Sequence, residues 1–256
     1  MATTITGTTI DVGTNVIVTD SAGNVGIGTS SPASSVGSCV DATGPLLVGG
    51  HINSHQTNKS VIENNSNNMK LRAYGATSGT GYMTFHTGGG GDAADSEAMR
   101  INSAGIVTKP LQPAFSVHKN NTDQGPIAEG VYVLVTWTTE RFDQNADFDL
   151  TNNRFVAPVS GKYQFNANIR LDNIDATAQN YILVISTSNA GYNFIIPTSV
   201  MFSSDATYFS ISCSVLADMD TGDTSEVQIR QDPSGVVQTE IEGDATYTNF
   251  SGFLAC

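Results

Sequence analysis

Aromatic residues are distributed unevenly along this 256-residue chain, and their distribution limits where a hydrophobic core can form. Of the twenty Phe, Tyr and Trp residues, seventeen lie after residue 113. The residues before that point are rich in Gly, Ser, Thr and Asn and hold only Tyr74, Tyr82 and Phe85. Because large aromatic side chains dominate the energetics of a core, we predict two parts: a polar segment over residues 1–113 and a compact domain over residues 114–256.

The front segment has too few bulky side chains to order itself alone, since fixing a backbone costs about 1–2 kcal/mol per residue. Its short apolar stretches are separated by Gly- and Asn-rich turns. The Ser-Ala-Gly turn at 20–23 is echoed at 102–105, each time before a short strand that ends near a proline. Two copies are too few to indicate a solenoid. We therefore expect a β-rich shaft that is ordered by association with other copies of the chain.

In the rear domain, apolar and polar residues alternate with the period of two that is typical of β-strands. The clearest strand runs from Tyr163 to Leu171, with every second residue apolar. Turn-forming residues separate such runs about every ten residues, which predicts an all-β jelly-roll sandwich of about ten antiparallel strands. The residues expected to form its core are Phe155, Gly161, Tyr163, Phe165, Phe250 and Phe253.

Charge and hydropathy exclude several partners. The formal net charge is −13, of which −11 falls in the rear domain, and no basic cluster is present. We therefore expect no nucleic-acid partner and no binding to an anionic membrane surface. No stretch approaches the roughly 20 apolar residues that cross a bilayer, and no signal peptide is visible. The widely spaced Cys39, Cys213 and Cys256 fit assembly in a reducing cytoplasm.

Metal and cofactor sites are not expected. His51 and His55 lie among Gly and Asn residues, which favours solvated histidines; three symmetry copies binding a metal on a trimer axis is the alternative. The acidic run from Asp218 to Glu226 suggests calcium, but its spacing does not match the twelve-residue calcium loop. A polar hairpin turn is the favoured interpretation there, and calcium stays an alternative.

The sequence offers no catalytic residue. It has neither a nucleophile elbow nor a phosphate-binding loop, and the carboxylates of Asp147 and Asp149 are interpreted as solvated loop charges rather than a glycosidase pair. A candidate contact loop contains Asn189, Tyr192 and Asn193. Tyr192 could stack on a sugar ring there, and packing on its own neighbours is the alternative.

Two resemblances add to this interpretation. Phe155 followed by Gly161-Lys-Tyr163-Gln-Phe165, the Gly222-Asp223 turn, and Phe250-Ser-Gly-Phe-Leu254 resemble the globular head of the complement first-component q subunit. That resemblance covers about residues 114–256. It implies a ten-stranded jelly roll related to tumour-necrosis-factor-like ligands, and a trimer. The residues 152–154 depart from the family at one turn, where a glycine is usual.

The front segment is similar to bacteriophage tail-fibre sequences. The similarity lies in three phrases, at residues 23–32, 82–89 and 99–105, and in their order within one chain. Together the resemblances imply a homotrimeric virion fibre, assembled in the host cytoplasm, whose residues 1–113 attach to other virion proteins. The head would then bind a host-surface glycan or protein through its loops, by hydrogen bonds and aromatic contacts rather than by charge. Alternatives are a capsid-decorating or neck fibre with a structural role, and a short tailspike depolymerase.

Overall fold

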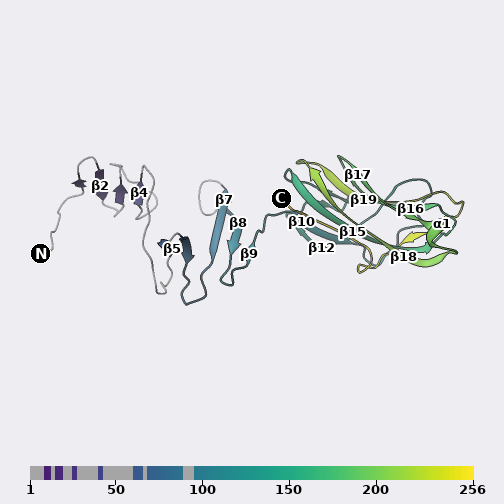
Figure 1. Ribbon diagram of the computed structural model, residues 1–256, viewed down its shortest axis with the longest axis horizontal. Helices are drawn as coiled ribbons and strands as arrows, with labels where there is room; N and C mark the ends of the chain where they lie inside the picture. The colour runs from purple at the N-terminus through teal and green to yellow at the C-terminus, as the bar shows by residue number, and fades with distance from the viewer. Residues whose placement is uncertain are drawn as a thin grey trace. The chain divides into compact units, whose positions relative to one another are not determined.

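The computed structural model describes residues 9–12, 15–19, 25–27, 40–42, 60–65, 68–88 and 95–256 (Figure 1). The chain divides into two compact units. One comprises Met1–Met83 and Ile101–Ile106, and the other comprises Thr84–Arg100 and Val107–Cys256. Within the described ranges the only helix is α1 (Thr198–Met201), and every other element is a strand. The expected all-β class is confirmed, while the boundary at residue 113 stays a prediction.

The first unit contains short strands. A four-stranded sheet has the order β1 (Thr9–Val12), β2 (Asn15–Thr19), β3 (Val25–Ile27), β4 (Val40–Ala42), with β3 and β4 parallel. A separate hairpin pairs β5 (Ser60–Asn65) with β6 (Asn68–Ala73). Ile62 and Leu71 of this hairpin are exposed. Among residues whose burial is described, every buried hydrophobic residue lies at or after Phe115, so the core that the structure describes is in the rear of the chain.

A three-stranded sheet follows, formed by β7 (Met83–Gly88), β8 (Asp95–Ile101) and β9 (Val107–Thr108). The predicted turn at 102–105 joins β8 to β9. The Asn102 Oδ1 accepts hydrogen bonds from the backbone N–H groups of Ala104 (2.9 Å) and Ile106 (3.0 Å), and Gly105 has φ +80°. Asn is suited to such turns because its side chain bonds to its own backbone. The first copy of the turn, at 20–23, lies outside the described residues.

The second unit contains the predicted sandwich, with six strands in each of two antiparallel sheets, five of them in one continuous order. The sheet that we call the β10 sheet has the order β12 (Thr139–Gln144), β10 (Ala114–His118), β21 (Asn249–Leu254), β15 (Gly161–Ile174), β18 (Ala206–Met219). The β16 sheet has the order β13 (Phe148–Asp149), β14 (Arg154–Val156), β19 (Thr224–Gln231), β16 (Asn180–Thr187), β17 (Gly191–Pro197). Two-residue strands β11 (Val133–Leu134) and β20 (Glu240–Ile241) pair with β19 and β15. The jelly-roll prediction is confirmed.

The core lies between the two sheets and follows the predicted alternation. In β15 every second residue from Tyr163 to Leu171 is buried, and the polar residues between them face outward. Phe155, Tyr163, Phe165 and Phe250 are all buried, and their neighbouring ring centroids are 5.3 to 6.1 Å apart. Gly161 is half-buried under the end of the chain, where an added Cβ would lie 2.7 Å from the Leu254 Cδ1.

The structure corrects the expectation that Phe253 belongs to this core. Phe250 and Phe253 are three positions apart, so in a strand they point to opposite faces. Phe250 is fully buried and Phe253 is 47% exposed. The inward position belongs to Gly252, because an added Cβ there would lie 2.6 Å from the Phe165 ring and 2.8 Å from the Phe115 ring. The two rings fill the space that a side chain at 252 would need.

The sandwich has two distinct ends. At the entry end, β10 begins beside the C-terminus: Ala114 pairs with Phe253, and Gly161 pairs with Met219. The turns at 157–161, 188–191 and 220–223 lie here too, joined by bonds such as that from the Gly222 N–H to the Ala157 carbonyl (2.8 Å). We call the opposite end the far end; its segments are 119–138, 172–180, 198–205 and 232–248. Figure 1 shows the C-terminus and α1 at opposite ends of the sandwich.

Candidate functional site

The predicted contact loop lies at the entry end of the sandwich. The turn at 188–191 joins β16 to β17, and Asn189 and Tyr192 line a cavity of about 300 Å³ together with Asp218, Met219 and Asp220. Asn193 is exposed and does not line this cavity, because it lies on the opposite face of β17 from Tyr192. Tyr192 itself packs partly against the core. Two of the three predicted residues therefore share a site, and that site is at the entry end, beside the end of β18.

The acidic run beside this cavity forms the hairpin turn between β18 and β19. The Asp223 Oδ2 accepts hydrogen bonds from the Asp220 N–H (2.8 Å) and from the Asn189 Nδ2 (2.7 Å). Lys162 pairs with Asp218 at 2.5 Å. Gly222 has φ +91°, a conformation that disfavours side chains. These contacts use the carboxylates to hold the turn to its neighbours, as the hairpin interpretation requires.

Of the histidines and cysteines, His86, His118, Cys213 and Cys256 lie within the described residues. His51, His55 and Cys39 lie outside the described residues. The His118 Nδ1 is 2.6 Å from the Lys119 carbonyl oxygen and His86 is exposed on β7. Across the ranges that the structure describes, no group of three or more His, Cys, Asp or Glu residues is arranged to hold a metal ion.

Asp147 and Asp149 have different surroundings, and the burial of the Asp147 carboxylate corrects the expectation that both are solvated loop charges. The Asp149 carboxylate accepts hydrogen bonds from the side chain and backbone of Asn152 and from the Thr151 N–H, which lower its pKa. Asp147 has a buried Oδ2 without a hydrogen-bond partner among the described residues. Burial, and then the charge of Asp143, raise the pKa of Asp147. One carboxylate therefore closes a turn while the other carries a desolvation cost, and neither arrangement indicates catalysis.

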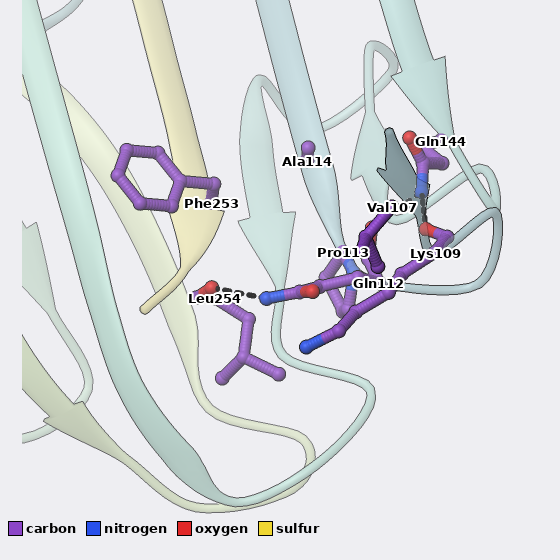
Figure 2. Close-up of a pocket in the computed structure, with 8 residues that line it drawn as sticks. All are labelled: Val107, Lys109, Gln112, Pro113, Ala114, Gln144, Phe253 and Leu254. Carbon is purple, nitrogen blue, oxygen red and sulfur yellow. Dashed lines mark hydrogen bonds between the residues drawn. The ribbon is translucent and has the colours of Figure 1, made fainter. Parts of the chain in front are cut away.

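A larger cavity, of about 470 Å³, marks where the chain enters the sandwich (Figure 2). The Gln112 Nε2 donates to the Leu254 carbonyl oxygen (2.8 Å). The Gln144 Nε2 donates to the carbonyl oxygens of Lys109 and Gln112 (both 2.8 Å). These amides hydrogen-bond to the chain's own backbone and so attach the entering segment to the sandwich. For this reason we do not interpret the cavity as a polar ligand site. Phe253 lines the same cavity.

The far end is held together by contacts between segments that are distant in sequence. Gln124 and Ile241 exchange two backbone hydrogen bonds (2.9 and 2.8 Å), and the Ile127 N–H donates to the Thr239 carbonyl (2.8 Å). The Tyr181 hydroxyl is 2.6 Å from the Thr239 Oγ1, inside the sandwich. Buried hydrogen bonds of this kind are expensive to break, because each leaves an unsatisfied polar group.

Ser234 joins two further far-end segments. The Glu129 Oε1 accepts hydrogen bonds from the Ser234 N–H (2.7 Å), the Ser234 Oγ (2.5 Å) and the Gly235 N–H (3.1 Å), and those from Ser234 lower the pKa of Glu129 most. The Ser234 Oγ also contacts the Asp175 Oδ2. Asp205 continues the connection, because its carboxylate accepts from the Ala176 N–H (2.9 Å) and from the Gln238 Nε2 (3.1 Å). All four segments are thereby connected.

A buried lysine completes this framework. Lys119 is 2% exposed, and its Nζ donates to the Gln124 Oε1 (3.3 Å) and to the backbone and hydroxyl oxygens of Thr136 (both 3.2 Å). Burial lowers the pKa of Lys119. The Gln124 Nε2 in turn donates to the Leu134 carbonyl (2.7 Å). Three acceptors around one ammonium group thus join Lys119 to Gln124 and Thr136, two other positions of the 119–138 segment.

The far end exposes apolar side chains on this framework. The sequence analysis did not identify these residues as a surface. Val200 is 82% exposed, the largest value among the exposed large hydrophobic residues of the described chain. Apart from Tyr247, which lies over Arg170 of β15, the exposed large hydrophobic residues of the four segments are Val131, Tyr132, Val200, Met201, Val236 and Val237. The sequence contains one signal for this surface, which is a pair of adjacent apolar residues in each of three turn-rich segments. Because three segments each expose two adjacent apolar side chains, the far end is a candidate contact surface.

The outer face of the β10 sheet is a second candidate surface. Its uncharged centre is a network in which the Gln164 Nε2 donates to the Ser214 Oγ (2.8 Å) and the Ser214 Oγ donates to the Asn166 Oδ1 (2.9 Å). Around this network, five large side chains are exposed: Phe142, Tyr208, Leu216, Tyr247 and Phe253. A broad sheet face of amides, hydroxyls and exposed rings is suited to contact with another protein surface.

Comparisons with known proteins find likeness in structure only. No family model matches the chain, and no curated protein matches it. Among solved structures, the globular domain of a zebrafish complement 1qA protein is 19% identical, with a TM-score of 0.41, and the match covers 57% of this chain and 98% of that one. Two crystal structures of murine APRIL, at pH 8.5 and pH 8.0, are each 10% identical, with TM-scores of 0.41, covering 56% of this chain and 98% of theirs.

Within the described residues, no helix has the length and apolar character to cross a bilayer.

Proposed function

We propose that this chain is a homotrimeric fibre protein of a bacteriophage virion, and that its head binds the host cell surface during adsorption. The mechanism is binding rather than chemistry. The observation that carries the binding role is the far end: three segments expose apolar side chains on a framework fixed by Lys119, Glu129 and Ser234. A preorganised surface loses little conformational entropy when a partner binds, so it retains more of its contact energy.

The contact loop expected at Asn189, Tyr192 and Asn193 is a weaker candidate for the host-binding surface. It lies at the entry end, where the preceding 113 residues join the sandwich. The far end is the opposite end of the same unit from the point where residues 107–113 enter it. We therefore assign host contact to the far end.

The proposed trimer is supported by the outer face of the β10 sheet. Phe253 and Leu216 flank Gln164 on this face, and both are more than 45% exposed in the single chain. Burying a side chain of this size contributes roughly 1.5–3 kcal/mol, so association of three copies would stabilise the head. Three heads also bind a surface together, which raises the effective affinity of weak single contacts.

The assignment to a phage virion rests on the front segment, whose phrases at 23–32, 82–89 and 99–105 resemble tail-fibre sequences. We propose that this segment attaches to other virion proteins and is ordered by trimerisation. Ile62, Leu71, Tyr82 and Phe85 are exposed in the single chain, which suits a segment that buries its apolar groups between copies.

Adsorption competition tests the function directly. Excess purified full-length chain, added to host cells before the phage, is expected to slow adsorption of whole particles. Cryo-microscopy of the particles would locate the protein. A trimer that neither binds host cells nor competes, and that lies on the capsid or neck, would replace this proposal with a decorating or neck fibre. Release of reducing sugar from host envelope would instead indicate a depolymerase.

A further inference from the structure

We infer that the partner of the far end is a host protein surface that carries both apolar and basic side chains, and not a polysaccharide. This inference rests on the proposed host-binding function and names the chemistry of its partner. Three observations carry it: the kind of side chains that are exposed, the charges around them, and the framework beneath them.

The exposed side chains are of the wrong kind for sugars. Of the six, four are valines, one is Met201 and one is Tyr132. Sugars are bound by hydrogen-bonding groups and by stacking on free aromatic faces, and aliphatic tips offer neither. The Tyr132 ring already has a partner, because the Arg230 guanidinium lies 5.4 Å from its centroid. Aliphatic groups and Met are instead suited to an apolar protein surface, where contact removes both surfaces from water.

The charges around these side chains are one-sided. The four far-end segments hold nine Asp and Glu residues, and their one Lys or Arg is the buried Lys119. Two arginines on adjoining strands are already paired, Arg170 with Asp172 (2.7 Å) and Arg230 with Asp232 (3.2 Å). Counting Arg170 and Arg230 together with Lys119, a surplus of six negative charges remains. Such a surface repels anionic polysaccharide and attracts a basic partner.

The acidic far end leads us to propose charge-dependent recognition, whereas the sequence alone predicts recognition that does not depend on charge. The sequence shows seventeen acidic residues in the rear domain, but it does not show that nine of them gather around one end. The carboxylates of Glu129 and Asp205 accept hydrogen bonds from backbone N–H groups. These bonds hold the two negative charges in position. A fixed field gives orientation to an approaching partner and raises its association rate.

Binding of the labelled full-length chain to host cells tests the inference in three arms: untreated cells, cells treated with protease, and cells treated with periodate. We expect binding to be lost after protease and retained after periodate. Raising NaCl from about 0.1 M to 0.5 M shortens the screening length from about 10 Å to roughly 4 Å. This change is expected to weaken binding several-fold.

A pair of matched variants locates the surface. Val200→Ser with Val237→Ser should weaken binding about tenfold or more, while Leu111→Ser with Val159→Ser, two exposed residues of the entry end, should not. Native mass and melting temperature show whether each variant still assembles. Binding that survives protease and is lost after periodate overturns the inference, as does equal loss in both variants. Absence of binding to untreated cells by the assembled trimer would instead refute the proposed function itself.

Discussion

Replacing Phe165 by Ala is the sharpest test of the sandwich core. The ring is fully buried, and its centroid lies 5.7 Å from Phe155, 5.8 Å from Phe250 and 6.3 Å from Phe115. The strands around it are hydrogen-bonded on both sides and cannot collapse into the space. Removing such a ring costs about 3–5 kcal/mol. At roughly 3 °C per kcal/mol for a domain of this size, the melting temperature should fall by roughly 10–15 °C.

Phe253→Ala is the matched control, because it deletes the same atoms from the outer face of the same sheet. A substitution at an exposed position changes the stability of a single chain by about 0.5 kcal/mol or less. If this face joins the proposed trimer, the effect appears instead in the assembly. The melting temperature of Phe253→Ala should then depend on protein concentration more steeply than that of the unmodified chain.

Thermal unfolding followed by circular dichroism at several protein concentrations separates the two effects, and native mass spectrometry reports the number of chains. The Phe165→Ala loss should be present at every concentration, and the Phe253→Ala loss should be greatest in dilute samples. Equal losses for the two variants at all concentrations would mean that β21 has the opposite strand phase. No loss for Phe165→Ala would refute the core described above.

Three further predictions follow from single contacts. Gly252→Ala should cost about 1–3 kcal/mol in chemical denaturation, because its Cβ would overlap two buried rings; an unchanged midpoint would contradict that packing. Asp147→Asn should stabilise the head at neutral pH. Burial raises the pKa of Asp147, so the folded state becomes less stable as pH rises above the ordinary carboxyl pKa and Asp147 ionises. The gain in melting temperature should therefore vanish at acid pH, and a gain that persists there would refute this reasoning. Ser234→Ala should cost about 1–2 kcal/mol and speed amide exchange at 232–237 and 175–177; unchanged exchange would show that Ser234 does not join those segments.

The sequence predicts which residues of a strand are buried wherever one face of that strand is exposed to solvent. In β15 the alternation from Tyr163 to Leu171 identifies the buried face, because a two-residue period leaves no other choice. The same rule, applied strictly, would have placed Phe253 outside, since Phe250 already pointed inward. The sequence does not predict β12, because its residues Thr139–Gln144 are half-buried or exposed and show no apolar alternation.

The far end could not be predicted, because its order comes from pairs that are remote in sequence. Glu129 and Ser234 are 105 positions apart, and each alone is an ordinary polar loop residue. In the sequence, Lys119 cannot be distinguished from a solvated lysine. Only the fold shows that Gln124 and Thr136 accept hydrogen bonds from its ammonium group. The adjacent valines at 236 and 237 were visible, but only the fold shows that they lie outside the core.

The position of Trp137 has a practical consequence for spectroscopy. It is the chain's single tryptophan, it is 2% exposed, and its ring centroid lies 6.0 Å from that of Phe250. Its emission therefore arises from inside the sandwich and shifts to longer wavelength only when water reaches that interior. Fluorescence melts of the intact chain will thus follow the head and be blind to the first 113 residues, whose assembly needs a separate probe.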